Sequence, residues 1–522
     1  MTIGDIFADH LRQRPGALAL IDDRGGRRVT YAELGQEVAA AVAWLEEQGL
    51  RRGQAVLVFV PVSVDLYVAL LALFRLGAVA LLLDPGAGPE HLEQCCRRWP
   101  PAALLAVPRA HLLRLRSPAL RRIPLQIAVG GWFPGARRWP AGRRSVIPDT
   151  EAGLPPEQPA LVTFTSGSTG TPKAAVRTHG FLLAQLRVLA PHLALEPGEV
   201  DLATLPVFTL ANLAAGVTTV LPDLDLRRPG AVDGAAVAAA VKRHGVTRIT
   251  ASPAFFERLS AHLHARGETL PALQKLFTGG APVFPRLLAA LGNVAPRARI
   301  AAVYGSTEAE PIAHVEAAEM AAADEAAMQR GRGLLAGRPV GEVRLQILRD
   351  RWGEPRGAMD AAQFAREAMA CGQAGEIVVT GGHVLRGYLG GVGDDETKFS
   401  VDGVIWHRTG DAGRIDEHGR LWLLGRCAAR IDDPRGRLYP FTVECVAMSF
   451  PAVRQAAFIA HAGRRCLVVA ASRTADLESR LAAALAWAQP DAITFQRALP
   501  VDRRHNAKID YPALRRVLDR LG

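Results

Sequence analysis

The chain has 522 residues, too many for one hydrophobic core, which predicts at least two domains. Hydrophobic residues make up 49% and charged residues 22%, which excludes a disordered or fibrous protein. Lys and Arg number 62 against 51 Asp and Glu, so the formal net charge is +11. Such a charge could serve nucleic acid or a membrane surface. We expect scattered basic residues in an Arg-rich protein with anionic ligands, and no nucleic-acid partner.

The cysteines and the apolar segments bear on location. None of the six cysteines forms a CxxC pair, so we expect free thiols in a reducing cytoplasm and no zinc site. The first 20 residues lack a charged head followed by an apolar core, so no signal peptide is expected. The most apolar stretch, residues 55–83, is interrupted by Asp65 and Arg75. It is typical of a strand, a helix and a strand, and we expect no transmembrane segment.

The N-terminal elements alternate between helix and strand. Thr30 and Glu33 form a capping-box pattern for a helix that runs to about Gln48. The pattern continues with a strand over 56–60, a helix over 65–75 and a strand over 78–83. This βαβ order predicts a parallel sheet. Further strands are predicted near 160–165, 217–221, 248–251 and 299–303.

From about residue 373 the texture changes to short strands with glycine turns. We predict strands over 376–379, 406–408 and 421–424. The last hundred residues predict a small α+β unit with a strand over 466–471, a helix over 475–487 and a strand over 493–499. We place a domain boundary near Arg426, which gives domains 1–425 and 426–522.

Residues 163–173 read Thr-Phe-Thr-Ser-Gly-Ser-Thr-Gly-Thr-Pro-Lys, between a strand-like run and a helical pattern. Glycines let the backbone approach an anion closely, and hydroxyl and N–H groups donate to phosphate oxygens. Pro172 before the lysine distinguishes the segment from a GxxxxGK[ST] loop. A Ser/Gly linker is the alternative, but a linker would not stand between a strand and a helix. The candidate phosphate-binding residues are Thr165, Ser166, Gly167, Ser168, Thr169, Gly170 and Lys173.

This segment resembles the signature loop of the AMP-forming adenylating superfamily, which includes acyl-CoA synthetases, adenylation domains of peptide synthetases and firefly-type luciferases. The other family motifs follow in the expected order, and the resemblance covers nearly the whole chain. It implies an α/β fold with a large N-terminal adenylating domain of αβα layers plus a β-subdomain, and a small mobile α+β C-terminal domain. It also implies that ATP and Mg²⁺ serve to activate a carboxylic acid as an acyl-AMP.

Residues 303–308, Val-Tyr-Gly-Ser-Thr-Glu, resemble the second nucleotide motif of the family. The resemblance implies that Tyr304 stacks on adenine, that Thr307 contacts phosphate and that Glu308 holds Mg²⁺. Mg²⁺ prefers hard carboxylate oxygens, so the last role is chemically sound. The remaining residues that the resemblance assigns to nucleotide or metal are Gly305 and Ser306 in the same turn, Gly280, Ala281 and Pro282 in the pocket loop, and Thr169 as a second metal residue.

The C-terminal motifs would complete the nucleotide site. Asp411, in Arg-Thr-Gly-Asp, resembles the residue that accepts hydrogen bonds from both ribose hydroxyls, for which one carboxylate has enough acceptors. The resemblance places Arg426 beside it and a hinge near Ala428, where Ala departs from the usual Asp or Lys. Lys508 resembles the catalytic lysine that bridges the substrate carboxylate and the α-phosphate. A placed ammonium stabilises the charge that grows there in the transition state.

Two departures bear on the acceptor of the acyl group. Many acyl-CoA synthetases have His after an L-P-x-F segment, whereas this chain has Thr209. Pro434 and Arg435 stand where adjacent glycines usually let pantetheine pass. Both departures resemble the β-lactone synthetases of the bacterial long-chain olefin pathway. That resemblance implies a 3-hydroxy fatty acid as substrate, closure to a β-lactone, pathway enzymes as possible partners, and His505 as a candidate base.

Four alternatives stay open, and one of them, nucleic-acid binding, rests only on the net charge. A fatty acyl-CoA or acyl-carrier-protein ligase would use CoA or a carrier protein as acceptor. A free-standing amino-acid adenylation domain would need an Asp for the α-amino group, and residues 202–221 contain none. An inactive binding scaffold would be expected to lack Lys508 or Glu308, and both are present.

Overall fold

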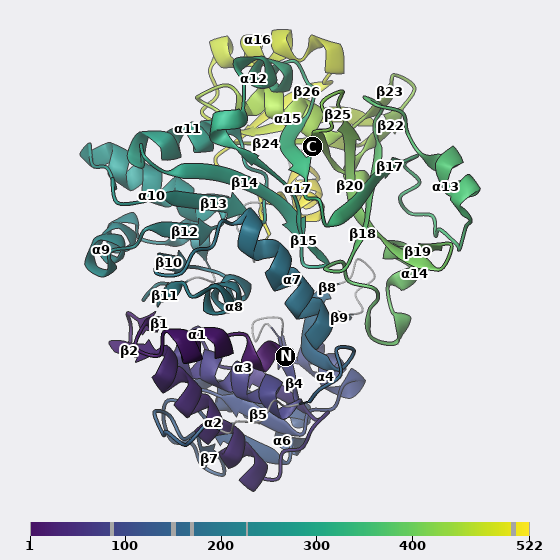
Figure 1. The fold of residues 1–522 in the computed structure, drawn as a ribbon. Helices are drawn as coiled ribbons and strands as arrows, with labels where there is room; N and C mark the ends of the chain where they lie inside the picture. Colours follow the sequence, from purple (N-terminus) through teal and green to yellow (C-terminus); the bar gives the residue numbers. More distant parts are fainter. Residues whose placement is uncertain are drawn as a thin grey trace. The chain divides into compact units, whose positions relative to one another are not determined.

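The computed structural model describes residues 2–83, 88–147, 153–166, 172–225, 228–502 and 508–520. The chain forms two compact units. Figure 1 shows the chain coloured by residue number, from purple at the N-terminus to yellow at the C-terminus. Unit 1 comprises Met1–Asp223 and Gly382–Asp394, and unit 2 comprises Leu224–Gly381 and Asp395–Gly522. The predicted domain boundary near Arg426 lies inside unit 2 and stays a prediction.

Unit 1 contains a sheet in the order β7-β6-β5-β3-β4-β8-β9, parallel throughout except for the β8–β9 pair. This confirms the parallel sheet predicted from the βαβ pattern. Its strands are β3 (Ala55–Phe59), β4 (Val79–Leu82), β5 (Ala103–Ala106), β6 (Leu125–Ala128), β7 (Arg137–Arg138), β8 (Pro159–Ser166) and β9 (Pro172–Thr178). Four more strands pair in the order β10-β11-β1-β2, with bounds β1 (Leu18–Asp22), β2 (Arg27–Thr30), β10 (Val200–Ala203) and β11 (Thr218–Leu221).

The helices of unit 1 begin where the sequence offers caps. The Thr30 side chain accepts from the Glu33 N–H in a capping box, and α2 spans Tyr31–Glu47, which confirms that prediction. Gly77, at φ +73°, ends α3 (Val64–Leu76), a conformation that favours glycine. The other helices are η1 (Ile3–Asp5), α1 (Ala8–Gln13), α4 (Pro89–Arg98), α5 (Pro108–His111), η3 (Leu112–Leu115), α6 (Pro118–Arg122), α7 (His179–His192), α8 (Pro206–Ala215) and η6 (Leu389–Gly391).

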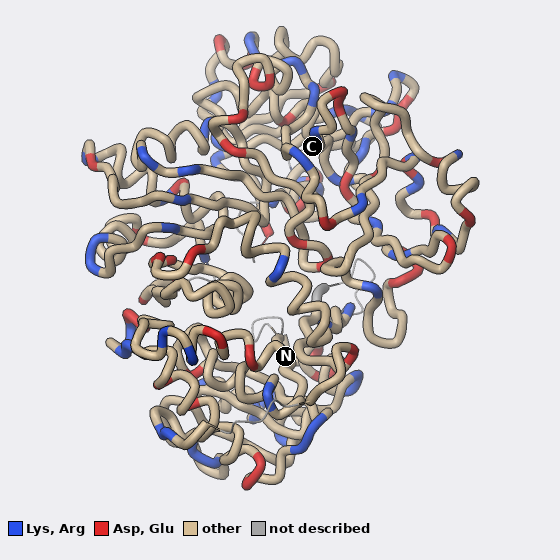
Figure 2. The backbone as a smooth tube through the Cα atoms, in the orientation of Figure 1, with Lys and Arg blue, Asp and Glu red and all other residues tan. Residues whose placement is uncertain are grey.

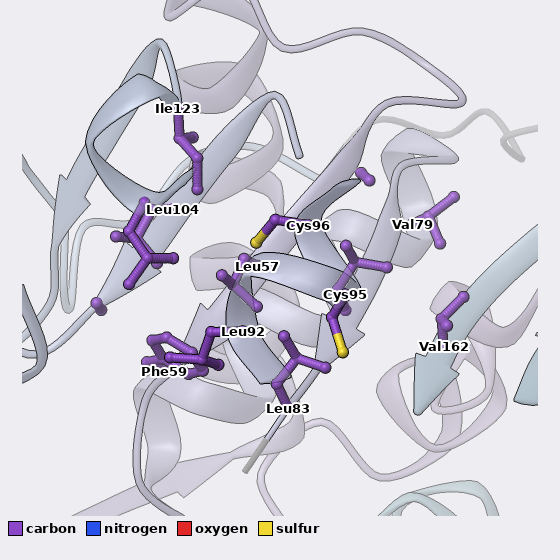
Figure 3. Close-up of a cluster of buried hydrophobic side chains, with 14 of the residues drawn as sticks. Leu57, Phe59, Val79, Leu83, Leu92, Cys95, Cys96, Leu104, Ile123 and Val162 are labelled. Atoms are coloured by element: carbon purple, nitrogen blue, oxygen red, sulfur yellow. The ribbon is translucent and has the colours of Figure 1, made fainter. Parts of the chain in front are cut away.

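The core of unit 1 lies between the parallel strands and α4. Leu57, Val79 and Leu104 from the strands meet Leu92 and Cys95 from α4, and all five are buried (Figure 3). Burial of large aliphatic side chains stabilises a fold by roughly 1.5–3 kcal/mol each. The parallel strands therefore read as continuous apolar runs, because both of their faces are covered.

One sequence prediction in unit 1 is wrong. The helical pattern expected directly after the phosphate loop is a strand, because β9 pairs antiparallel with β8 from Ser166↔Pro172 to Pro159↔Thr178. The helix α7 begins only at His179, where the Thr178 side chain accepts from the Phe181 N–H. Lys173 therefore lies on a strand. Pairing with the preceding strand β8, and not the periodicity of these residues, decides their conformation.

Unit 2 contains a sheet in the order β12-β13-β14-β15-β16-β21-β20-β18-β17, with β19 on β20. The pairs β12–β13 and β13–β14 are parallel and the later pairs are antiparallel. The strands are β12 (Arg248–Ala251), β13 (Lys275–Gly279), β14 (Arg299–Ser306), β15 (Ala309–Glu316), β16 (Leu334–Pro339), β17 (Val343–Leu348), β18 (Gly375–Gly381), β19 (Lys398–Val401), β20 (Val404–Ile415) and β21 (Leu421–Arg426). Its helices are η4 (Pro229–Ala231), α9 (Gly234–His244), α10 (Pro253–Arg266), α11 (Pro285–Val294), η5 (Ala317–Glu319), α12 (Ala322–Gln329) and α13 (Ala361–Glu367); α14 (Asp394–Thr397) begins at the last residue of unit 1.

The C-terminal part of unit 2 has a small sheet of its own. Strands β24 (Gln455–His461), β25 (Arg464–Ala470) and β26 (Ala492–Gln496) pair in that order. Alternate residues face opposite sides: Phe458 packs in the cluster with α15 and α16, and Ile459 in the cluster with α17. The remaining elements are η7 (Cys427–Ala429), β22 (Ile431–Asp433), β23 (Gly436–Leu438), α15 (Pro440–Met448), α16 (Ala475–Ala484), η8 (Ala486–Ala488) and α17 (Tyr511–Leu518).

The other predicted strands and helices are confirmed, with ends shifted by a few residues. All six cysteines are free thiols, as expected, and Cys371 is the exposed one. Within the described ranges, no helix is both long enough and apolar enough to cross a membrane.

Candidate active site

The structure describes only some of the predicted phosphate-loop residues. Gly167, Ser168, Thr169 and Gly170 lie outside the described residues, and Thr165 and Ser166 are described as backbone at the end of β8. Lys173 is buried in unit 1, with its Nζ 6.0 Å from the centroid of the Tyr388 ring. Its aliphatic carbons lie so close to Gly393 that a Cβ there would approach them to 2.6 Å. The segment Gly382–Asp394 therefore packs around the lysine of the predicted loop.

Unit 2 contains a cavity of about 410 Å³ that gathers most of the other predicted residues. The loop after β13, the end of β14, and β20 and β21 contribute to its wall, as does the C-terminal part of the chain. The predicted residues that line it are Gly280, Ala281, Pro282, Tyr304, Gly305, Ser306, Asp411, Arg426 and Lys508. Motifs separated by more than two hundred residues thus meet around one space.

The remaining predicted residues lie beside the cavity or outside the described ranges. Thr307 and Glu308 follow Ser306 in the turn between β14 and β15, and they do not line the cavity wall. Ala428 lies in η7, directly after β21. His505 lies outside the described residues.

Tyr304, Asp411 and Arg426 form one connected group in the cavity wall. The Tyr304 hydroxyl donates to Asp411 Oδ2 at 2.8 Å, and Arg426 Nη1 lies 3.3 Å from Asp411 Oδ1. Asp411 and Arg426 are directly opposite in the β20–β21 ladder. Burial, and then the neighbouring Asp411 charge, raise the pKa of Tyr304 well above its usual value, so the phenol stays protonated and donates. The group presents an aromatic ring beside an oriented carboxylate.

A buried ion pair holds the strand that carries Asp411. Arg408, fully buried on β20, donates through Nε to Glu376 Oε1 at 2.8 Å and through Nη2 to Oε2 at 2.9 Å. Such bidentate pairs fix geometry as well as charge. Thr409 continues the support, because its hydroxyl donates to the Ile377 carbonyl and accepts from the Asp411 N–H. The chain around Asp411 is therefore anchored to β18.

Glu308 interacts electrostatically with Arg426 and His407. Its charge, after that of Asp411, helps to raise the pKa of Arg426. It also opposes the shift at His407, whose pKa burial and then the Lys398 charge lower to about 3. Lys398 Nζ lies 3.1 Å from His407 Nδ1, and both residues are buried. His407 is therefore neutral, and Arg426 carries positive charge near Glu308.

The backbone of Lys508 is fixed by two hydrogen bonds to Asp502. Its N–H donates to Asp502 Oδ1 at 3.0 Å, and its carbonyl accepts from the Asp502 N–H at 2.8 Å. Val501 and Ile509 form an antiparallel bridge next to this pair. The two sides of the final motif are thereby fixed to each other, and Lys508 lines the cavity.

Arg286 on α11 connects the larger part of unit 2 to its C-terminal part. Its guanidinium donates to the Val453 carbonyl at 2.6 Å and to the Arg454 carbonyl at 2.8 Å. These two carbonyls immediately precede β24, and Arg454 also lines the cavity. The contact positions the C-terminal part against the cavity.

The cavity also holds two residues that sequence reasoning missed, Glu444 on α15 and Tyr511 on α17. Glu444 Oε1 accepts from the Tyr511 hydroxyl at 2.7 Å and from the Phe458 N–H at 2.9 Å. Burial raises the pKa of Glu444 to about 7, against the two hydrogen bonds that lower it. The available signal was a lone acid within the apolar run Val443–Met448, which local pattern alone assigns to a core helix.

We expect Glu444→Gln to change how stability depends on pH. The folded-state pKa is about 7 against 4.5 for the free group, so Glu444 supports folding fully below about pH 4.5. That support declines as the pH rises and is absent above about pH 7. The variant should gain up to about 3 kcal/mol relative to the wild type across this window. Urea unfolding at both ends of the window measures the gain, and an equal shift in Glu46→Gln, an exposed acid on α2, would contradict it.

Thr209 and Arg435, the two departures, are both described. Thr209 is buried within α8 of unit 1. Arg435 lies between β22 and β23, and its guanidinium pairs with Asp433 and Asp491, each at 2.9 Å. A glycine would leave that turn without a side chain, whereas Arg435 fastens it to the start of β26.

A family model described as AMP-binding enzyme matches residues 7–389. The chain belongs to this family. Among curated relatives of this AMP-binding enzyme, the Olefin beta-lactone synthetase of Stenotrophomonas maltophilia is 33% identical and aligns over 92% of this chain and 89% of its own. The Olefin beta-lactone synthetase of Xanthomonas campestris pv. campestris is 34% identical, over 95% of this chain and 94% of its own.

Solved structures agree on the fold of this AMP-binding enzyme. The amide bond synthetase McbA from Marinactinospora thermotolerans superposes with a TM-score of 0.80 at 24% identity, over 98% of this chain and 99% of that chain. ATP-bound MatB from Rhodopseudomonas palustris gives 0.76 at 20% identity, over 100% of both chains. The protein is an AMP-forming ligase with the adenylate-forming fold, and enzymes of its family use ATP.

Proposed function

We propose that this enzyme activates a 3-hydroxy fatty acid as its acyl-AMP and closes the product to a β-lactone. The observation that carries the proposal is the identity of 33% and 34%, over nearly full length, to two relatives named Olefin beta-lactone synthetase. The cavity in unit 2 supports the first step, because it brings Tyr304, Asp411 and Lys508 together. Thr209 and Arg435, at the positions where thiol-using relatives differ, support the second.

The first step joins the acid to ATP. A carboxylate oxygen attacks the α-phosphorus, and the bond to pyrophosphate breaks. Both reactants are anions, so the enzyme must neutralise and align them. We assign Lys508 to the oxygens between carboxylate and α-phosphate, Tyr304 to the adenine face and Asp411 with Arg426 to the ribose. The glycine-rich loop after β8 and Lys173 would take the other phosphates.

The second step needs no thiol. The 3-hydroxyl oxygen attacks the acyl carbonyl carbon, and the carbonyl–phosphate oxygen bond breaks, so AMP leaves with that electron pair. The hydroxyl proton passes to a base, for which His505 is the candidate. Nucleophile and electrophile belong to one molecule, so proximity favours closure. Cleavage of the acyl phosphate offsets the ring strain. In this proposal the C-terminal domain reorients between the steps about a hinge at Ala428.

A magnesium ion would accompany the nucleotide. Among the described residues, no group of three or more His, Cys, Asp or Glu residues forms a preassembled metal site. Mg²⁺ bound with a nucleotide needs only one or two carboxylates beside the phosphates. Glu308 would supply one carboxylate, and Thr169 is the proposed second residue. When bound, the ion would add positive charge to the phosphate oxygens.

We expect Glu308→Gln to raise the Mg²⁺ concentration needed for half-maximal adenylation by roughly tenfold, as for loss of one charge-assisted contact of about 1.4 kcal/mol. Pyrophosphate release against Mg²⁺ concentration measures the effect. Glu325→Gln, an exposed acid on α12, is the matched control. An unchanged Mg²⁺ requirement in Glu308→Gln would remove the metal role.

The decisive experiment offers the enzyme ATP and Mg²⁺ with a 3-hydroxy fatty acid, and no thiol. Mass spectrometry should find AMP and a β-lactone in equal amounts. The matched control is the same fatty acid without the hydroxyl, which can form the adenylate but no lactone. Adenylate from both acids, with no lactone from either and a thioester once CoA or a carrier protein is added, would establish the ligase alternative.

A further inference from the structure

The whole net charge of the protein is concentrated in one segment. Residues 97–147 contain eleven Arg, no Lys and no Asp or Glu. The 51 Lys and Arg residues elsewhere are balanced by the 51 Asp and Glu residues, so the segment accounts for the entire +11. The basic residues are scattered along the chain, as expected, but their excess over acidic residues is not.

The segment forms the β5–β7 side of the parallel sheet in unit 1 and the short helices next to it. It runs through β5, α5, η3, α6, β6 and β7. Figure 2 shows blue positions where Figure 1 labels α6 and β7. Nine of the eleven arginines are exposed: Arg97, Arg109, Arg116, Arg121, Arg122, Arg137, Arg138, Arg143 and Arg144. Of these nine, Arg144 alone forms an ion pair with a described carboxylate, that of Glu33 at 2.7 Å.

Large apolar side chains are exposed among these arginines. Leu112 is 54% exposed, Leu115 71% and Trp132 71%. The two segments that carry them pack together, because the His111 and Phe133 rings stack at 5.0 Å and Arg114 lies over Phe133. A Cβ on Gly131 would also meet Pro108 at 2.8 Å. The loop with Trp132 therefore packs against α5 and η3, and η3 carries the two leucines.

We propose that this surface docks on an anionic lipid membrane. We call it the arginine face and define it as the six exposed arginines of residues 109–138 together with Leu112, Leu115 and Trp132. Anionic headgroups complement unpaired arginines, each of which adds to the attraction near the surface. Trp and Leu side chains enter the boundary between headgroups and acyl chains. The arginine face thus matches both layers of a lipid surface.

Nucleic acid would match the charge but not the apolar side chains. Phosphate contacts use Arg and Lys, and they gain nothing from exposed leucines. Four of the face arginines, at positions 109, 116, 121 and 122, lie within or next to the short helices that carry Leu112 and Leu115 or follow them. The lipid surface is therefore the partner that explains both halves of the face.

The test is sedimentation of the full-length protein with vesicles. Wild type should bind vesicles of phosphatidylcholine with phosphatidylglycerol, should bind phosphatidylcholine alone far more weakly, and should be released by salt. Arg109→Glu/Arg116→Glu/Arg137→Glu should weaken binding to the anionic vesicles by about a hundredfold or more. Leu115→Ser/Trp132→Ser should weaken it by roughly tenfold with the charge unchanged.

The matched control reverses three exposed arginines elsewhere, in Arg28→Glu/Arg187→Glu/Arg366→Glu, and gives the same net charge. This control should keep most of the binding, and all variants should form adenylate at the wild-type rate in lipid-free solution. Equal losses in the control and the face variant would overturn the proposal, because total charge would then explain binding. Equal binding to both vesicle types would overturn it too. So would duplex DNA binding that depends on the face arginines but not on Leu115 and Trp132, together with no vesicle binding.

Discussion

Lys508→Ala should lower the rate of adenylate formation by roughly 10²–10³-fold, the loss typical for one donor to a developing oxyanion. The Lys508 ammonium is the cation of the final motif in the cavity with Tyr304 and Asp411, and its backbone is fixed by Asp502. The effect should fall on the chemical step, because the charge that it stabilises grows only in the transition state. Affinity for ATP should change by less than about tenfold. Quenched-flow measurement of acyl-AMP, with calorimetry for ATP, separates the two quantities.

The outcome for Lys508 needs a control on the same part of the chain. Arg516→Ala removes an exposed cation from α17, a few residues further on, and should leave the adenylation rate within about twofold of wild type. An adenylation rate in Lys508→Ala equal to wild type would refute the assignment. A loss of ATP binding as large as the loss of rate would also refute it, because the lysine would then act in the ground state.

Glu376→Ala should reduce the free energy of unfolding of unit 2 by about 3–5 kcal/mol. Glu376 is fully buried and accepts both bonds from Arg408, and Arg356 Nη2 lies 3.6 Å from its Oε2. Removing the carboxylate leaves two buried guanidinium groups without that countercharge. The same change should loosen the strand that carries Asp411. Urea unfolding followed by the fluorescence of unit 2 tryptophans measures the loss of stability.

The matched control for Glu376 is an exposed pair. Glu478 accepts from Arg473 at 2.8 Å on the surface of α16, and Glu478→Ala should leave the free energy of unfolding nearly unchanged, because water screens an exposed pair. Similar losses in both variants would show that burial of the Arg408–Glu376 pair is not what makes it important. Glu376→Gln, which keeps the shape, should fall between the alanine variant and wild type.

The sequence predicted those features of the fold that local rules decide. The Thr30 capping box placed α2, and the apolar runs of 56–60 and 78–83 predicted strands of a parallel sheet. The helix predicted directly after the phosphate loop was wrong, because these residues form a strand that exists only through pairing with β8. The return of Gly382–Asp394 to unit 1 was equally invisible, since the Ala175↔Tyr388 bridge joins residues far apart in the chain.

The site divides in the same way. Tyr304, Asp411, Arg426 and Lys508 were chosen from motifs, and the structure brings these four to one cavity. Glu444 was missed, because an acid in an apolar helix carries no local sign that Tyr511 will cover it. The arginine face was missed because runs of basic residues were sought, whereas the signal is the absence of Asp and Glu over residues 97–147. For Glu444, the missing information is which residues from separate parts of the chain lie next to one another in the folded protein.

The contact made by Arg286 bears on how easily the C-terminal part can detach. The guanidinium donates to two backbone carbonyl oxygens, which are neutral acceptors. Breaking these two hydrogen bonds therefore separates no pair of opposite charges. Water replaces each bond at a cost of about 0.5–1.5 kcal/mol. We expect the breaking and re-forming of these two hydrogen bonds to depend little on ionic strength. It would suit the reorientation of the C-terminal part that we propose between the two steps.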